Sequence, residues 1–311
     1  MHSMRDVLII GSGPAGLTAA IYANRSGLDT AVIEALAGSG GQVVNTSEID
    51  NYPALPGING FELGMKMREH VDSFGVPVIQ DKVTAIDHSE PGRMVVKGEK
   101  DSYEAKAVVI ATGANHRLLG VPGEKELAGM GVSYCAVCDG AFYRGLTTAV
   151  VGGGNVAVAD AQYLSRICEK VYLIHRRDSL RAMDSLQKKI LSTPNVEVKW
   201  NSIVKEVRGK QEVEELLIGT RPDANSDYNK EEILKVDGVF MGVGMIPTAD
   251  FIDDIAKDEG GYIIAGEDGV TSIPGIFAAG DVRAKNLRQI ITACGDGANV
   301  ISSVENYLAA L

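Results

Sequence analysis

The sequence lacks the features that define several large classes of protein. No apolar run approaches the roughly 20 residues that span a bilayer, and the N-terminal run Val7–Ile10 is too short for a signal peptide. The formal net charge of -11, with no basic stripe, argues against a nucleic-acid partner. Four cysteines in 311 residues are too few for a disulfide scaffold. We therefore expect a cytoplasmic protein that binds neither membrane nor nucleic acid.

What the chain has in excess is glycine, and much of it lies in tight clusters. Two clusters, Gly11-Ser12-Gly13-Pro14-Ala15-Gly16 and Gly152-Gly153-Gly154-Asn155-Val156-Ala157, each lie between a strand pattern and a helix pattern. A second strand follows each helix and ends at Glu34 and at His175, in both cases 23 residues after the first glycine of the cluster. One such turn is a weak signal, but two in the same register predict two nucleotide-binding units.

The segments around these units predict how the domains are organised. Each unit is followed by short alternating strands, namely Val83–Asp87 with Arg93–Lys97, and Val196–Val198 with Glu214–Ile218. The C-terminal segment carries a further apolar strand that ends at Gly280 and Asp281, and this segment most simply completes the first domain. We therefore predict an α/β fold of two Rossmann-like, three-layer ββα domains, the second inserted into the first. The predicted bounds are 1–117 with 246–311 for the first domain and 118–245 for the second.

The first glycine turn has the arrangement that binds a dinucleotide. Gly11 permits the tight turn, Gly13 lets a pyrophosphate approach the main chain, and Gly16 lets the helix pack on the strand. Glu34 can accept hydrogen bonds from both hydroxyls of an unmodified ribose and rejects a 2′-phosphate. We expect FAD or NAD at this site.

In the second unit the acidic residue is replaced by basic ones. His175, Arg176 and Arg177 stand at the corresponding position, with Arg181 shortly after. Guanidinium groups bind a phosphate through forked, charge-assisted hydrogen bonds, which indicates NADP with its 2′-phosphate. The alternative is a solvated basic face. Asp281 similarly has two interpretations, as a ligand-binding carboxylate or as the cap of the helix that follows.

A pair of cysteines precedes the second glycine turn. Cys135 and Cys138 are spaced to close a small disulfide ring, and Asp139 is next to them in the sequence, where it can move protons. The alternative is half of a zinc site, which needs two further ligands, whereas Cys168 and Cys294 each stand alone. We interpret those two as packing thiols and expect no metal.

These motifs together resemble the bacterial low-molecular-weight thioredoxin reductases, which are homodimeric FAD enzymes of the pyridine nucleotide-disulfide oxidoreductase class. The resemblance runs from end to end, and its most specific motif is the dithiol inside the second nucleotide domain. It implies an oxidoreductase that carries electrons from NADPH through FAD and the Cys135–Cys138 disulfide to a thioredoxin-like protein. Cys138 is then the thiol next to the flavin, Cys135 the thiol that attacks the partner, and Asp139 the acid/base.

The resemblance also implies two sets of cofactor contacts. The implied FAD contacts are Gly11, Gly13, Pro14, Ala15, Gly16, Glu34, Gly41, Gln42, Asn51, Val83, Thr112, Gly113, Gly280, Asp281, Arg288, Gln289 and Ile290. The implied NADP contacts are Gly152, Gly154, Asn155, Val156, His175, Arg176, Arg177 and Arg181. The chain departs from the family at Val156, where the family has serine, and at Ala159, the first of a usual pair of acids. Both departures bear on how tightly NADPH binds.

Other functions remain open at this point. A flavoprotein reductase of related architecture could serve another acceptor, such as a different small disulfide protein, a ferredoxin or a peroxiredoxin system. The glutathione reductase arrangement uses a C-terminal histidine, whereas the last histidine here is His175. A nucleotide sensor without turnover would not need Cys135, Cys138 and Asp139 together.

Overall fold

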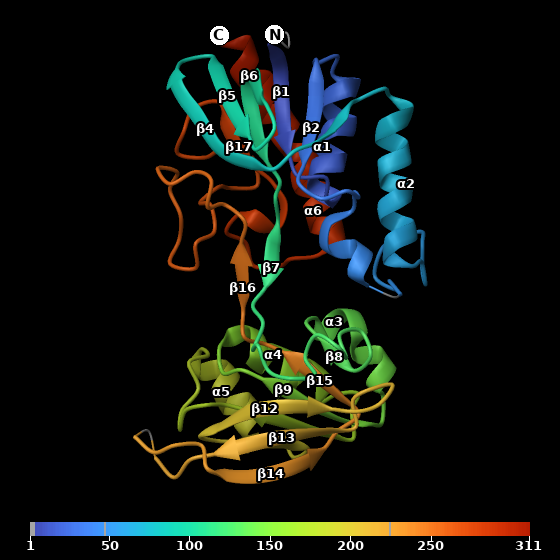
Figure 1. Ribbon diagram of the computed structural model, residues 1–311, viewed down its shortest axis with the longest axis vertical. Coiled ribbons are helices and arrows are strands. Elements are labelled where there is room, and N and C mark those ends of the chain that lie inside the picture. Colours follow the sequence, from blue (N-terminus) through green and yellow to red (C-terminus); the bar gives the residue numbers. More distant parts are fainter. Residues whose placement is uncertain (1–3, 47, 224) are drawn as a thin grey trace. The chain divides into compact units, whose positions relative to one another are not determined.

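The computed structural model describes residues 4–46, 48–223 and 225–311, and it divides the chain into two compact units (Figure 1). Unit 1 consists of residues 1–115 and 246–311, and unit 2 consists of residues 116–245. The chain passes between the units twice, through β7 (Ala114–His116) and β16 (Met245–Pro247), and these two strands pair with each other. Unit 1 is therefore discontinuous in sequence, and unit 2 is inserted into it.

Unit 1 is built on a seven-stranded sheet in which β17 pairs with β6 beside the order β3-β2-β1-β6-β5-β4. Its strands are β1 (Arg5–Ile10), β2 (Thr30–Glu34), β3 (Val78–Gln80), β4 (Val83–Glu90), β5 (Arg93–Gly98), β6 (Ser102–Ile110) and β17 (Ile276–Ala278). The pairs of β1 with β2 and β6, of β2 with β3 and of β17 with β6 are parallel, whereas β4, β5 and β6 pair antiparallel. Its helices are α1 (Pro14–Arg25), α2 (Gly60–Ser73) and α6 (Ile290–Ala309), with short 3-10 turns η1 (Gly41–Asn45) and η3 (Gly280–Val282).

The parallel part of this sheet is buried on both faces, which explains its continuous apolar strands. Val7 and Ile9 of β1 belong to the cluster packed against α1 and α6, whereas Leu8 and Ile10 belong to the cluster on the side of the antiparallel strands. Helices α1 and α6 approach closely because α6 carries Gly297, where a Cβ atom would lie 2.2 Å from a main-chain oxygen of α1. The result is three layers, with helices on one face and antiparallel strands on the other.

Unit 2 repeats this plan on a smaller scale. Its parallel sheet has the order β11-β10-β9-β15-β8, and a separate antiparallel sheet has the order β12-β13-β14. The elements are β8 (Val132–Ser133), α3 (Ala136–Asp139), η2 (Gly140–Tyr143), β9 (Thr147–Val151), α4 (Asn155–Leu164), β10 (Lys170–Ile174), α5 (Asp184–Leu191), β11 (Val196–Lys199), β12 (Ser202–Arg208), β13 (Glu215–Thr220), β14 (Lys230–Lys235) and β15 (Gly238–Met241). The predicted α/β class with two Rossmann-like, three-layer units is confirmed.

One predicted strand pairing is wrong. Val196–Val198 does not join the strand near Glu214–Ile218; it lies in β11 and pairs in parallel with β10. The partners of β13 are instead β12, which follows β11 directly, and β14. The reason is that Val196 and Val198 pack into the same apolar cluster as α4, so β11 belongs to the parallel layer.

Candidate functional site

The first glycine turn joins β1 to α1 with each glycine in a distinct role. Gly11 has a φ of +102°, which L side chains rarely adopt, and a Cβ atom there would lie 2.5 Å from the carbonyl oxygen of Ala111. A Cβ atom on Gly16 would lie 1.9 Å from the carbonyl oxygen of Gly11, so only glycine lets the helix pack this closely on the turn. Gly13 differs, because its nearest contact is the Cα atom of Gly41 at 3.9 Å. The second glycine therefore leaves open space beside the main chain.

This open space fits a dinucleotide phosphate. Helix α1 begins after Gly13 with Pro14 and Ala15 in its first turn, and no side chain within the described residues caps it. By contrast, the side chain of Asn59 caps α2 and accepts hydrogen bonds from its first N–H groups. The free N–H groups of α1 thus face the cradle formed by Gly13 and Gly41, which suits an anion.

Glu34 ends β2 beside this turn. One carboxylate oxygen accepts hydrogen bonds from the main-chain N–H of Ser12 at 2.7 Å and from its hydroxyl at 2.6 Å. The other accepts from the N–H of Leu36 at 2.9 Å. These contacts hold the carboxylate at the C-terminal edge of the parallel sheet, where ligands of open α/β sheets bind. The oxygen that accepts only from Leu36 keeps acceptor capacity for a ribose.

Hydrogen bonds fix the side chains of several other FAD candidates of unit 1. Asn51 donates to the side-chain oxygen of Gln289 at 3.1 Å, and Gln42 donates to Asn115 at 2.8 Å. Gln289 caps α6, so Ile290 is the first residue of that helix. Of the remaining candidates, Gly113 follows β6, and the hydroxyl of Thr112 donates a hydrogen bond to the carbonyl oxygen of Thr248. Gly280 and Asp281 lie in η3, and the guanidinium of Arg288 lies over the ring of Tyr262.

Val83 is the FAD candidate that the structure places least favourably. Its side chain is buried in the apolar core of unit 1 at the start of β4. Only its main chain is therefore available to a ligand.

The second glycine turn, in unit 2, repeats the geometry of the first. Gly152 has a φ of +147°, and a Cβ atom there would lie 2.4 Å from the carbonyl oxygen of Gly242. Gly154 has no atom within 4 Å of the position its Cβ would take, and it precedes α4 without a capping side chain among the described residues. Asn155 accepts a hydrogen bond from the N–H of Met183 at 2.8 Å, while the side chain of Val156 is 60% exposed. The turn is therefore open beside Gly154, which suits a dinucleotide pyrophosphate.

The basic candidates after β10 divide into one buried residue and three exposed ones. His175 is 4% exposed, its ring lies against Gly153, and Nε2 contacts the carbonyl oxygen of Ser179 at 3.0 Å. Burial lowers the pKa of His175, and the nearby guanidinium groups lower it further. The neutral ring therefore supports the turn from beneath.

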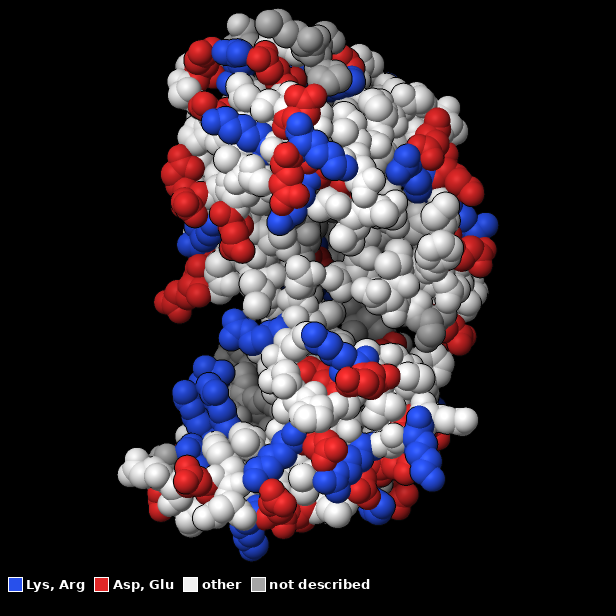
Figure 2. Space-filling view, viewed as in Figure 1, with Lys and Arg blue, Asp and Glu red and all other residues white. Residues whose placement is uncertain are grey.

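The side chains of Arg176, Arg177 and Arg181 are exposed. Within the described part of the chain none of these three forms an ion pair, so their charges are available to a ligand. The N–H of Arg181 donates to the carbonyl of Gly153 at 2.7 Å, which ties this loop to the glycine turn. Basic side chains gather on the side of unit 2 where α5 lies (Figure 2).

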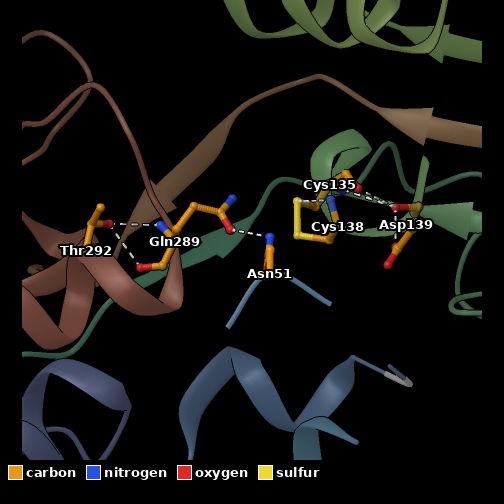
Figure 3. The surroundings of a disulfide bond; sticks show 7 residues. Asn51, Cys135, Cys138, Asp139, Gln289 and Thr292 are labelled. Carbon is orange, nitrogen blue, oxygen red and sulfur yellow. Dashed lines mark hydrogen bonds between the residues drawn. A yellow bond between two sulfur atoms is a disulfide. The ribbon is translucent and has the colours of Figure 1, made fainter. Parts of the chain in front are cut away.

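Cys135 and Cys138 form a disulfide at the N-terminus of α3 (Figure 3). Both residues are half-buried, so the ring is reachable. The Cys135 sulfur accepts a hydrogen bond from the N–H of Cys138 at 3.2 Å. The same N–H is placed to stabilise a thiolate on Cys135 after reduction, because charge-assisted hydrogen bonds are stronger than neutral ones.

Asp139 follows the ring and is anchored on both sides. Its N–H donates to the carbonyl of Cys135 at 3.1 Å, and its carboxylate accepts a hydrogen bond from the hydroxyl of Ser133 at 2.6 Å. Burial raises the pKa of Asp139, and the bond from Ser133 acts in the opposite direction. A carboxyl group with a raised pKa can hold and release a proton closer to neutral pH.

Three residues that contribute to these sites went unrecognised in the sequence. Ser133 precedes the dithiol in β8 and carried no motif. Arg221 directly follows β13 and Tyr228 lies further along the chain, and both donate hydrogen bonds to the carbonyl oxygen of Arg176, at 3.2 and 3.1 Å.

Residues 4–46, 48–223 and 225–311 contain no group of three side chains suited to hold a metal ion. They also contain no helix long and apolar enough to cross a membrane.

Comparison with known proteins defines the class to which this site belongs. The family model described as pyridine nucleotide-disulphide oxidoreductase matches residues 5–297. The chain is 45% identical over 307 residues to a thioredoxin reductase of Listeria monocytogenes serovar 1/2a, which covers 98% of this chain and 94% of the relative. It is 44% identical to a thioredoxin reductase of Bacillus subtilis (strain 168), covering 98% and 95%.

A solved structure agrees with these sequence matches. The thioredoxin reductase of Streptococcus pyogenes MGAS5005 is 47% identical, with a TM-score of 0.91 and complete coverage of both chains. The chain therefore belongs to the pyridine nucleotide-disulphide oxidoreductases. These three full-length relatives are thioredoxin reductases, which confirms the family resemblance that the motifs indicated and with it the oxidoreductase class.

Proposed function

We propose that this chain reduces the disulfide of a thioredoxin-like protein with electrons from NADPH, using FAD and the Cys135–Cys138 pair. The observation that carries the proposal is a half-buried, closed disulfide ring directly followed by a carboxyl group whose pKa is raised by burial, in a unit that also holds an open glycine turn. FAD, when bound, accepts a hydride equivalent from NADPH and passes two electrons on to a disulfide.

The residues of each unit fit the cofactor proposed for it. In unit 1 the cradle of Gly13 and Gly41, the uncapped helix α1 and the carboxylate of Glu34 suit a dinucleotide with an unmodified ribose, as in FAD. In unit 2 the three exposed arginines suit the 2′-phosphate of NADPH. His175 supports this loop as a neutral ring, because burial lowers its pKa.

The dithiol chemistry follows from thiol–disulfide exchange. In the reduced enzyme the Cys135 thiolate attacks one sulfur of the partner disulfide, a mixed disulfide forms, and the other partner sulfur leaves as a thiolate that takes a proton. The Cys138 thiolate then attacks the sulfur of Cys135, the partner leaves as a dithiol, and the Cys135–Cys138 disulfide forms again. Asp139 is the proton donor and acceptor for these thiols.

The surface around the ring supports a protein substrate. Val137, between the two cysteines, is 48% exposed, and Phe142, shortly after them, is 49% exposed. Apolar side chains that flank a reactive ring give a small protein a surface on which to dock. A small-molecule disulfide would not need them.

The test is anaerobic NADPH oxidation by the FAD-loaded protein with and without a thioredoxin, with thiols measured by a chromogenic disulfide. Thioredoxin-dependent turnover that disappears in Cys138→Ser, but persists in Cys168→Ala, supports the proposal. Asp139→Asn should slow thiol formation about 100-fold or more, the usual range for general acid–base catalysis, while NADPH still bleaches the flavin. Flavin bleaching without thiol formation in the unmodified protein would assign another acceptor, and equal loss of both steps in Asp139→Asn would remove its assigned role.

We further propose that the enzyme is a homodimer of the cytoplasm. Phe61 and Met65, one turn apart on α2, are 62% and 38% exposed, which supports a contact between copies. The free thiols Cys168 and Cys294 suit a reducing compartment. Light scattering that gives the mass of a single chain would contradict the dimer, and recovery of the protein outside the cytoplasm by cell fractionation would contradict the compartment.

A further inference from the structure

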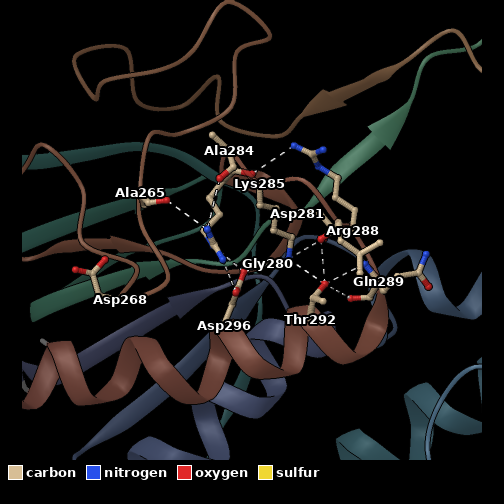
Figure 4. Close-up of polar contacts among 12 residues, drawn as sticks. Ala265, Asp268, Gly280, Asp281, Ala284, Lys285, Arg288, Gln289, Thr292 and Asp296 are labelled. Atoms are coloured by element: carbon tan, nitrogen blue, oxygen red, sulfur yellow. Dashed lines mark hydrogen bonds and ion pairs between the residues drawn. The ribbon is translucent and has the colours of Figure 1, made fainter. Parts of the chain in front are cut away.

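A buried network of charges lies under the C-terminal FAD candidates of unit 1 (Figure 4). At its centre is Asp296 of α6, which is 7% exposed. Its carboxylate accepts two hydrogen bonds from the guanidinium of Arg283, at 2.8 and 2.6 Å, and one from the main-chain N–H of Gly280 at 2.9 Å. Asp296 thus anchors the turn at Gly280 to α6, although the two residues are 16 positions apart.

Lys285 joins this anchor to Asp281. Its ammonium lies 3.1 Å from Oδ2 of Asp296 and 3.4 Å from Oδ1 of Asp281, and its side chain is 7% exposed. It also reaches the hydroxyl of Thr292 at 3.4 Å, and that hydroxyl accepts a hydrogen bond from the N–H of Gln289 at 3.1 Å. One buried cation therefore contacts the two segments that carry Asp281 and Gln289.

Asp281 depends on such a neighbour. Burial raises the pKa of Asp281, while the Lys285 ammonium and then Arg288 oppose that effect. The Asp281 side chain is 28% exposed, but its Oδ1 atom is buried, and within the described residues the Lys285 ammonium at 3.4 Å is the charge that compensates this atom. A buried carboxylate without a counter-ion loses its charge or moves toward water.

The other two cations of the network make different contacts. Arg283 directs two nitrogens to Asp296 and a third contact to the carbonyl of Ala265. Arg288 lies over the ring of Tyr262, with its guanidinium carbon 3.9 Å from the ring centroid. Lys285 is the cation that contacts both carboxylates.

We propose that Lys285 is a positioning residue of the FAD site, which couples Asp281 to Asp296 and so holds the Asp281 carboxylate as a charged acceptor for a hydroxyl group of the cofactor. The inference rests on the proposed function, because it takes Asp281 as an FAD ligand. Removal of the ammonium weakens FAD binding without any contact between Lys285 and FAD being required.

A double-mutant cycle on the full-length apoprotein tests this, with the dissociation constant of FAD measured by flavin fluorescence. Lys285→Met and Asp281→Asn should each weaken FAD binding roughly 10- to 100-fold, the range for hydrogen bonds to charged groups. If Lys285 acts through Asp281, the double variant should bind FAD within about threefold of Asp281→Asn alone, because coupled residues are not additive. Lys285→Arg, which keeps the charge, should restore most of the affinity.

The matched control is Lys257→Met. Lys257 is a half-buried lysine of the same unit whose ammonium is bonded to the carbonyls of Ala249 and Ile252. Its loss should leave FAD affinity unchanged within about threefold, since it has no link to Asp281. Lys285→Gln, which keeps a hydrogen-bond donor without the charge, replaces Lys285→Met if that variant does not fold, and should weaken binding in the same way.

The outcomes separate the inference from the function. Full FAD affinity in Lys285→Met or Lys285→Gln would overturn the inference and leave the function standing. The same holds if substitution of Lys285 weakens FAD binding by the same factor in the unmodified chain and in Asp281→Asn. Full affinity in Asp281→Asn would remove Asp281 from the FAD site. No FAD binding by the unmodified chain would overturn the proposed function itself.

Discussion

Replacing Arg176 and Arg177 by alanine should convert the enzyme's preference for NADPH into near indifference between NADPH and NADH. Both side chains are exposed and free of ion pairs within the described part of the chain, so their substitution disturbs no internal contact of the side chains. The NADPH 2′-phosphate is the group that distinguishes the two nucleotides. NADH lacks this phosphate, so the loss of the two arginines should not weaken its binding.

The size of the effect follows from the exposure of these side chains. A hydrogen bond to a charged group contributes about 1.5 kcal/mol at the exposed end of its range, which is roughly tenfold in affinity. One alanine should therefore lower kcat/KM for NADPH about tenfold and two about 100-fold, mostly through KM, if the two contacts are independent. The value for NADH should stay within about twofold.

The assay is steady-state oxidation of each nucleotide with a thioredoxin as acceptor. Arg166→Ala is the matched control, because Arg166 is an exposed arginine of the same unit that follows the C-terminal end of α4, opposite the end where the glycine turn lies. Parallel losses for NADPH and NADH would show that the arginines support the fold or the nicotinamide half, and would refute the assignment of a phosphate clamp. No loss for either nucleotide would refute it equally.

Two further predictions concern stability. Burial raises the pKa of Asp160 to about 6, above its ordinary 3.8. Below about pH 4 Asp160 is neutral in both the folded and the unfolded state, and its effect on stability is most favourable. The chain then loses stability as the pH rises through 6, because the buried carboxyl group must ionise. Between pH 5 and pH 8 the free energy of unfolding, measured with urea, should fall by about 1.4 kcal/mol less in Asp160→Asn than in the unmodified chain. An identical pH dependence of the two chains would contradict the argument. Gly16→Ala places a Cβ atom 1.9 Å from the carbonyl oxygen of Gly11 and should destabilise the apoprotein by about 2 kcal/mol and weaken FAD binding, whereas Gly38→Ala, which has no atom within 4 Å, should do neither.

Local patterns allowed much of this protein to be predicted. Each glycine turn is specified within a few residues, because the φ of Gly11 and the close approach at Gly16 are demands on the main chain that only glycine meets. The dithiol is equally local, since Cys135 and Cys138 lie on one short helical turn. The two nucleotide units, their order and the redox pair could therefore be predicted from the sequence alone.

Contacts between distant segments could not be predicted in this way. The alternating pattern of β11 suits either layer, and only its parallel pairing with β10 and its packing against the apolar cluster that includes α4 place it in the parallel sheet. His175 has the register of a phosphate ligand, but burial makes it a support for the glycine turn. Burial depends on the whole chain, whereas the pattern reports only neighbours.

The same limit applies to the charges that adjust the site. Nothing near Asp281 in the sequence indicates that Asp296, on a different element, bonds to the Gly280 turn and shares Lys285 with it. The sequence by itself determined which nucleotide motifs exist and where the dithiol lies, because those depend on main-chain conformation over a few residues. The tertiary structure alone decided which carboxylates are buried, which cation compensates each of them, and therefore which pKa values are shifted, because desolvation and charge pairing arise only when separate elements pack together.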